Sequence, residues 1–165
     1  MSLKIIHTAD WHLGQTFFGY DRDEEHEAFL SWLIDILTLR QTDVLLIAGD
    51  VFDVANPSAA AQRRFFRFLR EANRRNPQLQ IVIIAGNHDS AARLEAPIPL
   101  LEELNTSIVG AVPRTDLCKI DFDSLLIPLY NKEGKREAIC LAVPYLRQGD
   151  YPASKEGKDT YVEGV

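Results

Sequence analysis

The sequence predicts an α/β fold with a parallel sheet at its centre. Three apolar, β-branched runs, at residues 4–8, 44–48 and 81–85, have the length of strands and are apolar enough to be buried on both faces. Two stretches of helical periodicity, at about residues 23–41 and 56–75, lie between them. Strand, helix, strand, helix, strand at this spacing predicts a right-handed βαβαβ unit.

The composition places the chain among ordinary globular proteins and excludes few partners. It has 165 residues, of which 46% are hydrophobic and 25% charged, and a net charge of −6. This charge argues against a protein that binds nucleic acid through overall basicity, but not against one that reaches phosphates through metal ions. No apolar run approaches the roughly 20 residues that cross a bilayer, so we expect no membrane partner. The two cysteines lack metal-type spacing, and a cytoplasmic location is expected.

The two predicted helices each have an apolar stripe and a recognisable start. Acidic residues at 23–25 favour the positive end of the first helix dipole. Asn56 and Pro57 predict the start of the second helix, with Asn56 as the cap and Pro57 in the first helical position. The second helix should bury one stripe of residues: Ala61, Phe65, Phe68, Leu69 and Ala72.

Two surface features leave alternatives open. Six arginines occupy much of the rest of the second helix: Arg63, Arg64, Arg67, Arg70, Arg74 and Arg75. They form either a solvated face or a contact for a phosphate backbone or a partner. The loop at residues 15–20 carries Phe17, Phe18 and Tyr20, which either pack over the loop or form a wall against a nucleobase or a partner protein.

The second half of the chain predicts shorter elements. Pro97 and Pro99 limit a helix to about residues 100–104. Apolar β-like segments follow, and the turn at residues 131–134 predicts an antiparallel hairpin between the last two of them. These segments cover residues 107–112, 117–122, 125–129 and 138–143. Residues 150–165 are polar and show no core pattern.

Polar clusters follow each of the three buried strands. They are Asp10-x-His12, Gly49-Asp50-x-x-Asp53 and Gly86-Asn87-His88-Asp89. The carboxyl ends of parallel strands are where open α/β sheets place their ligands. In an extended segment the side chains of Asp10 and His12 lie on the same face, so both can reach one point. Carboxylate oxygens, imidazole nitrogens and the amide carbonyl oxygen of Asn87 suit divalent transition metals. The two oxygens of Asp50 can bridge a pair of such ions.

These motifs resemble the calcineurin-like metallophosphoesterase superfamily, whose pattern is D-x-H, then G-D, then G-N-H-D/E. The resemblance implies a partial α/β sandwich of that family, with the βαβαβ core followed by hairpin strands. It also implies two divalent metal ions, with Asp10 and His12 on the first, Asp50 bridging and Asn87 on the second. His88 would stabilise the transition state or protonate the leaving oxygen. Asp53 either orients His88 or caps a turn, and for Asp89 we expect helix capping.

Residues around the motifs, especially 7–15 and 25–33, resemble those of nuclease subunits from bacterial DNA-repair complexes. This resemblance implies Mn²⁺ as the metal, DNA as substrate, exonuclease and endonuclease activity in repair and recombination, an ATPase subunit as partner and a homodimer in the parent complex. Two rivals stay open. One is a phosphoesterase for nucleotides or phosphoproteins, and the other is a non-catalytic binding module of the same fold.

The chain departs from the family pattern in its histidines. The family takes further metal ligands from Gly-His and Gly-His-x-His motifs, but the chain's four histidines are His7, His12, His26 and His88. We therefore expect residues 1–150 to be the N-terminal part of a nuclease domain, and residues 151–165 to lead to a missing second half. Alone, the 165 residues should bind metal weakly and have little nuclease activity.

Overall fold

The computed structural model describes residues 2–101, 104–115, 119–147 and 150. Its centre is a four-stranded parallel sheet in the order β1-β4-β5-β6. The strands are β1 (Ile5–Thr8), β4 (Val44–Ala48), β5 (Gln80–Ile84) and β6 (Thr106–Val109). The predicted βαβαβ unit is confirmed, and β6 extends it by a fourth parallel strand.

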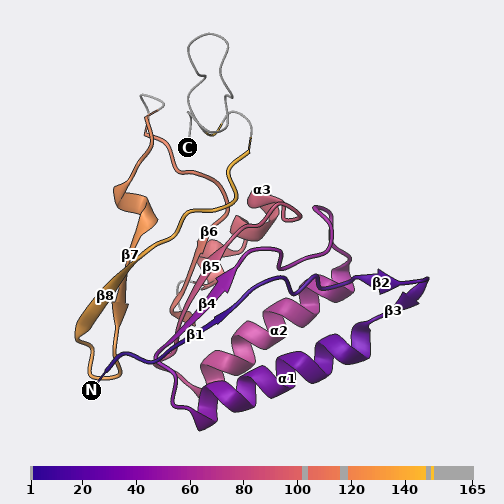
Figure 1. Cartoon of the computed structure of the whole chain (residues 1–165), viewed down its shortest axis with the longest axis horizontal. Coiled ribbons are helices and arrows are strands. Elements are labelled where there is room, and N and C mark those ends of the chain that lie inside the picture. Colours follow the sequence, from indigo (N-terminus) through magenta and orange to yellow (C-terminus); the bar gives the residue numbers. More distant parts are fainter. Residues whose placement is uncertain (1, 102–103, 116–118, 148–149, 151–165) are drawn as a thin grey trace.

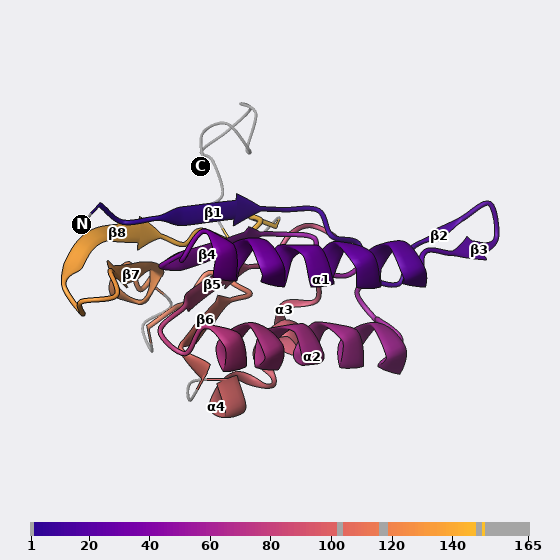
Figure 2. The ribbon, with the colours of Figure 1, turned by 90° about the horizontal axis from the view of Figure 1, so that it is seen from below.

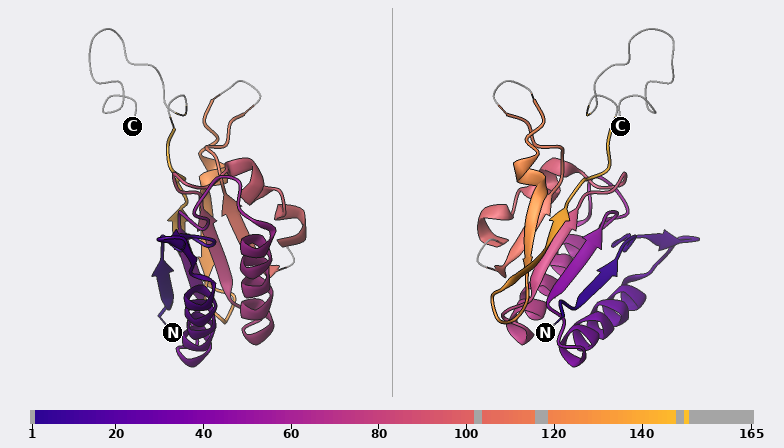
Figure 3. Two further views of the ribbon diagram at one scale, coloured as in Figure 1. Left: turned by 90° about the vertical axis from the view of Figure 1, so that its right-hand side faces the viewer. Right: turned by 60° about the vertical axis from the view of Figure 1, so that its left-hand side comes forward.

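The prediction that the first strand is buried on both faces was wrong. β1 lies at one edge of the sheet, where β4 is its neighbour (Figure 3). Ile5 and His7 are exposed along this edge. An apolar run alone does not distinguish an edge strand from a central one, because that depends on which strands pair with it.

Helices α1 (Asp23–Leu39) and α2 (Ala59–Arg75) cover one face of the sheet, as Figure 1 shows. The predicted apolar stripe of α2 is buried along its whole length. The helix begins later than predicted, however, because Ser58 is its cap. The Ser58 hydroxyl accepts a hydrogen bond of 3.1 Å from the Ala61 N–H, and Pro57 precedes the cap instead of following it.

The opposite face of the sheet is covered by the predicted antiparallel hairpin of β7 (Leu126–Tyr130) and β8 (Arg136–Leu141). Buried polar side chains join this hairpin to the sheet. The Gln80 amide donates to the Pro128 carbonyl at 2.8 Å and accepts from the Tyr130 N–H at 3.3 Å. Asp43 accepts from the Lys4 and Lys132 N–H groups at 2.7 and 3.2 Å. These bonds give the two buried polar side chains partners and tie the hairpin to the sheet.

The connection from β5 to β6 contains two short helices, α3 (Ala91–Glu95) and α4 (Ile98–Leu101). The helix predicted at residues 100–104 begins earlier than expected, at Ile98, and residues 102–103 of that prediction lie outside the described residues. Pro99 lies in the first turn of α4, where a proline is tolerated. Of the strand predicted at residues 117–122, residues 119–122 are described, and there Ile120 forms an isolated bridge with Arg114. The 3₁₀ turn η2 (Asp123–Leu125) follows.

The aromatic loop forms a small hairpin of β2 (Thr16–Phe17) and β3 (Tyr20–Asp21) that projects beyond the end of α1 (Figure 2). Phe18 and Gly19 form its turn with positive φ angles of 49° and 84°. Of the two alternatives for the aromatics, packing over the loop is wrong, because Phe18 is 88% exposed and its two aromatic neighbours are also exposed. In the described part of the chain, every helix is too short or too polar to cross a bilayer.

Candidate metal centre

The three polar clusters meet at the carboxyl edge of the sheet because β1, β4 and β5 are adjacent in it. Backbone pairing continues past the strands into the loops. The Asp10 N–H donates to the Gly49 carbonyl at 3.1 Å, and the His12 N–H donates to the Asp50 carbonyl at 3.0 Å. The first two clusters are therefore fixed to each other through main-chain bonds.

Asp10, His12 and Asp50 all have left-handed backbone conformations, with φ angles of 55°, 47° and 49°. For residues other than glycine this region costs about 1–2 kcal/mol and is concentrated at functional sites. The side chains of Asp10 and His12 come together, as predicted, but strand alternation is not the reason. Both residues lie beyond β1, in a turn whose backbone is not extended.

Trp11 explains how this turn is held. Its side chain is buried in the helix-covered core and packs edge-to-face against Phe29, Phe65 and Phe68, with ring centroids 5.7, 6.2 and 5.1 Å away. Its indole N–H donates to the Thr8 hydroxyl at 3.0 Å. With Trp11 anchored in the core, the two residues beside it are held at the edge of the sheet.

Glycine at position 86 allows the second and third clusters to touch. A Cβ at this position would collide with the backbone nitrogen and the carboxylate of Asp50. Gly49 has a φ of 90°, and a Cβ there would be 3.0 Å from the Gly86 Cα. The loop after β4 and the loop after β5 therefore make direct contact only with these glycines.

The residues predicted for the first metal site form a cluster of possible ligand atoms. His12 Nε2 lies 4.0 Å from Asp10 Oδ1 and 3.9 Å from Asp50 Oδ2, and one ligand atom from each residue lies within 4.8 Å of the other two. The Asp50 side chain is 11% exposed, whereas that of Asp10 is 71% exposed. Two carboxylates and one imidazole facing a common point, open on one side, fit a divalent metal ion with room for water or a phosphate.

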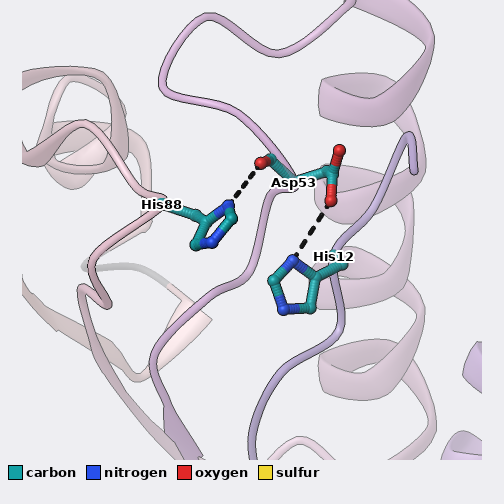
Figure 4. Close-up of side chains that lie close together, drawn as sticks. All are labelled: His12, Asp53 and His88. Atoms are coloured by element: carbon teal, nitrogen blue, oxygen red, sulfur yellow. Dashed lines mark hydrogen bonds and ion pairs between the residues drawn. The ribbon is translucent and has the colours of Figure 1, made fainter. Parts of the chain in front are cut away.

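Asp53 contacts both histidines, but not in the way that was predicted (Figure 4). Its carboxylate oxygen Oδ1 lies 3.3 Å from His12 Nδ1, and its backbone carbonyl lies 2.7 Å from His88 Nδ1. The contact with His88 therefore comes from the main chain. The carboxylate faces the ring nitrogen of His12 that points away from Asp10 and Asp50, as carboxylates behind metal-binding histidines do.

His88 is exposed and contacts residues of the other two clusters. Its ring packs edge-on against His12 at 4.8 Å between centroids. The backbone N–H of His88 donates to Asp50 Oδ1 at 2.9 Å. The hydrogen bond to the Asp53 carbonyl raises the pKa of His88, and the nearby carboxylates of Asp50, Asp53 and Asp89 act in the same direction. With Nδ1 bonded to that carbonyl, Nε2 is the ring nitrogen left for a substrate.

The expectation that Asp89 caps a helix was wrong. Its fully buried carboxylate accepts hydrogen bonds from three backbone N–H groups: those of Val51 at 3.2 Å, Phe52 at 3.0 Å and Gly86 at 2.9 Å. Asp89 thus joins the loop after β4 to its own loop from inside. Sequence reasoning missed this role because the N–H groups of Val51 and Phe52 belong to a segment 37–38 residues away.

Asn87 lies in the same loop, one residue before His88, and is exposed. Its backbone carbonyl accepts a bond of 3.3 Å from the Arg147 guanidinium. Its assignment as a ligand of the second metal stays a prediction. Sequence reasoning did not single out Arg147, which follows β8 and has no motif of its own.

The fold and the cluster of possible ligand atoms point to the class of metal-dependent phosphoesterase domains. Residues 3–150 match the family model of calcineurin-like phosphoesterases, and the chain belongs to this family. Divalent metal ions are implied by this membership, and the cluster of Asp10, His12 and Asp50 fits them.

The similar curated proteins narrow the family to one kind of member, the SbcD nuclease subunits. The chain is 48% identical over 163 residues to the SbcD subunit of the SbcCD nuclease of Rhodobacter capsulatus, covering 99% of this chain and 40% of that protein. It is 34% identical over 155 residues to the SbcD protein of Escherichia coli K12, covering 94% and 36%. The SbcD protein of Bacillus subtilis is 40% identical over 122 residues, covering 74% and 31%. The chain thus spans about two-fifths or less of the length of these relatives.

Proposed function

We propose that this chain is the N-terminal, metal-binding part of an SbcD-type nuclease subunit that hydrolyses DNA phosphodiesters with divalent metals. The observation that carries the proposal is the gathering of Asp10, His12 and Asp50 around one point beside the exposed ring of His88. The relatives named as SbcD subunits of the SbcCD nuclease support DNA as the substrate.

The metal ligands are proposed from the resemblance of the motifs, and the chemistry of the side chains supports them. Asp10, His12 and Asp50 would hold the first ion, and Asp50 with Asn87 would hold the second. Mixed carboxylate, imidazole and amide donors suit divalent transition metals, and Mn²⁺ is our proposed metal because the motifs resemble those of the nuclease subunits. When bound, a pair of such ions lowers the pKa of a water molecule and neutralises charge on a phosphate.

The protein's own groups orient the ligands and move a proton. Asp53 faces His12 Nδ1 and leaves His12 Nε2 toward Asp10 and Asp50. His88 is oriented by the Asp53 carbonyl, and a protonated His88 would donate from Nε2 to the leaving oxygen. His88 is therefore the proposed catalytic residue, and Asp53 is a positioning residue for both histidines.

The partners are proposed from the same relationship. The name SbcCD supports an SbcC-like ATPase as the second subunit of a complex on DNA. A homodimer in the parent complex and a cytoplasmic location are proposed from the resemblance of the motifs. The domain proposed for this chain comprises residues 1–150, and the prediction for residues 151–165 lies outside the described residues.

Metal binding by the chain itself tests the site. We expect weak Mn²⁺ binding, measured by electron paramagnetic resonance of the free ion. Asp50→Asn should weaken it at least tenfold, because the substitution removes the charge shared by both proposed sites. Asp35→Asn, at an exposed acid of α1, is the matched control and should leave it unchanged. Equal affinity in Asp50→Asn and the unmodified chain would refute the proposed centre.

Activity tests the substrate. The parent subunit should degrade linear duplex DNA with Mn²⁺, and His88→Gln should slow this about 10²–10⁴-fold, the usual contribution of a general acid. The 165 residues alone should show little cleavage. Efficient cleavage by this chain alone would contradict the ligand assignment, and hydrolysis of small phosphoesters without DNA degradation would favour the rival phosphoesterase.

A further inference from the structure

The segment that follows β8 returns to the carboxyl edge of the parallel sheet. The Tyr145 N–H donates to the carbonyl of Ala85, the residue directly after β5, at 2.9 Å. Two residues further on, Arg147 Nη2 donates to the Asp89 carbonyl at 2.7 Å and to the Asn87 carbonyl at 3.3 Å. These two carbonyls lie on either side of His88 in the sequence, 58 and 60 residues before Arg147.

Arg147 is itself held in place. The backbone N–H of Arg147 donates to Asp150 Oδ2 at 2.6 Å. Its guanidinium lies over the Tyr145 ring, 6.0 Å from the ring centroid. The Asp150 carbonyl in turn accepts from Arg114 Nη2 at 2.9 Å. The contacts with Tyr145 and Asp150 therefore help to hold Arg147 in place beside the loop.

The loop at residues 86–89 is thus fixed from two sides. On the inner side, the buried Asp89 carboxylate binds the Gly86 N–H and the backbone of the loop after β4. On the outer side, the Arg147 guanidinium binds the carbonyls before and after His88. Hydrogen bonds from a charged donor are stronger than those between neutral groups, and a planar guanidinium loses little conformational freedom in making them.

We propose that Arg147 is a positioning residue for the metal centre, holding the loop that presents Asn87 and His88. This inference rests on the proposed function for its consequence in metal binding, although the effect on the loop stands without it. A cation beside a metal site also repels the metal. Positioning and repulsion therefore predict opposite changes in metal affinity when the charge is removed, and the sign of the change separates them.

The test compares Arg147→Gln and Arg147→Lys with Arg93→Gln, a control at an exposed arginine of α3. Arg147→Gln should weaken Mn²⁺ binding about tenfold, the effect typical of groups that orient metal ligands. Arg147→Lys retains a charged donor and should recover part of the loss. Arg93→Gln should match the unmodified chain. Mn²⁺ binding that is unchanged or tighter in Arg147→Gln would overturn the proposal.

Amide hydrogen exchange gives a second measurement that needs no metal. In Arg147→Gln, the N–H groups of Gly86 and His88 should exchange faster, while those in the middle of β5 keep their rates. Exchange that is unchanged in the loop, or raised equally in β5, would overturn the positioning role. If the unmodified chain binds no Mn²⁺, the proposed function fails, and the exchange rates alone still decide the role of Arg147.

Discussion

At the carboxyl edge of the sheet, carboxylates accept hydrogen bonds from backbone N–H groups, whereas between α1 and α2 they are paired with arginines near the surface. Asp89 represents the first arrangement, with no exposed surface and three N–H donors. Arg64 and Arg75 represent the second, each bonded to acids of which at least one is about half exposed. The same kinds of charged side chain are therefore used in two very different surroundings.

The ion pairs of the helix interface also favour one of the alternatives for the arginines of α2, the solvated face. The sequence left open a solvated face or a contact for phosphates, but four of the six arginines are paired with carboxylates of α1 or α2: Arg64, Arg67, Arg74 and Arg75. Solvent screens most of these pairs. We expect the edge of the sheet to be much more sensitive to the loss of one charge than the interface of the two helices.

Replacing the buried carboxylate should have the largest effect. Asp89→Asn removes a charged acceptor and places an amide donor against backbone N–H groups that also donate. We expect the free energy of unfolding to fall by about 2–4 kcal/mol, as when a buried charged hydrogen-bond acceptor is lost. Urea unfolding followed by circular dichroism measures this change.

The matched control is Asp123→Asn, at an exposed acid of the η2 turn. Its free energy of unfolding should change by less than about 0.5 kcal/mol, as for most surface substitutions. If Asp89→Asn were no more destabilising than this control, the buried carboxylate would not be what joins the two loops.

Removing the most buried arginine of the helix interface should have a smaller effect. Arg64 bonds to Asp23 at 2.8 Å and Glu27 at 3.1 Å, and its Nη1 is buried without a hydrogen-bond partner. Arg64→Met keeps most of the aliphatic packing, and the two acids, about half exposed, return to water. The free energy of unfolding should fall by about 1 kcal/mol.

Arg63→Met, at an exposed position one residue earlier, is the control and should be close to neutral in the same urea unfolding experiment. A loss from Arg64→Met as large as that from Asp89→Asn would remove the contrast between the two regions.

Much of the fold could be predicted because the signals were local. Buried runs separated by helical periodicity identified the βαβαβ core, and the turn at residues 131–134 identified the β7–β8 hairpin. The edge position of β1 could not be predicted, since it depends on pairing across the sheet. The exposure of Phe17 and Phe18 could not be predicted either, because aromatic composition alone fits both packing over the loop and an exposed wall.

The candidate site was predicted in its residues but not in its supports. Asp10, His12 and Asp50 follow strand ends, so parallel topology brings the segments that carry them to one edge of the sheet. Asp89 was misassigned and Arg147 overlooked, because both act on backbone groups of segments distant in sequence. Side-chain identity carries no information about which distant N–H or carbonyl a residue will reach.

The smallest expected effect concerns an ion pair on the surface of α2, and it depends on pH. Glu71 accepts hydrogen bonds from Arg74 at 2.6 Å and from Arg75 at 3.0 Å, and these bonds lower the pKa of Glu71 to about 2. Its pKa in the unfolded chain is about 4.5. The contribution of the Glu71 charge to stability is therefore complete above pH 4.5 and is lost as the pH falls from about 4.5 toward 2.

Glu71→Gln should be slightly less stable than the unmodified chain at pH 7. Urea unfolding should show this difference in the free energy of unfolding shrinking by pH 3, and also in 1 M salt, which screens exposed charges. A difference that stays constant from pH 7 to pH 3 would show that the glutamate acts through packing and not through its charge.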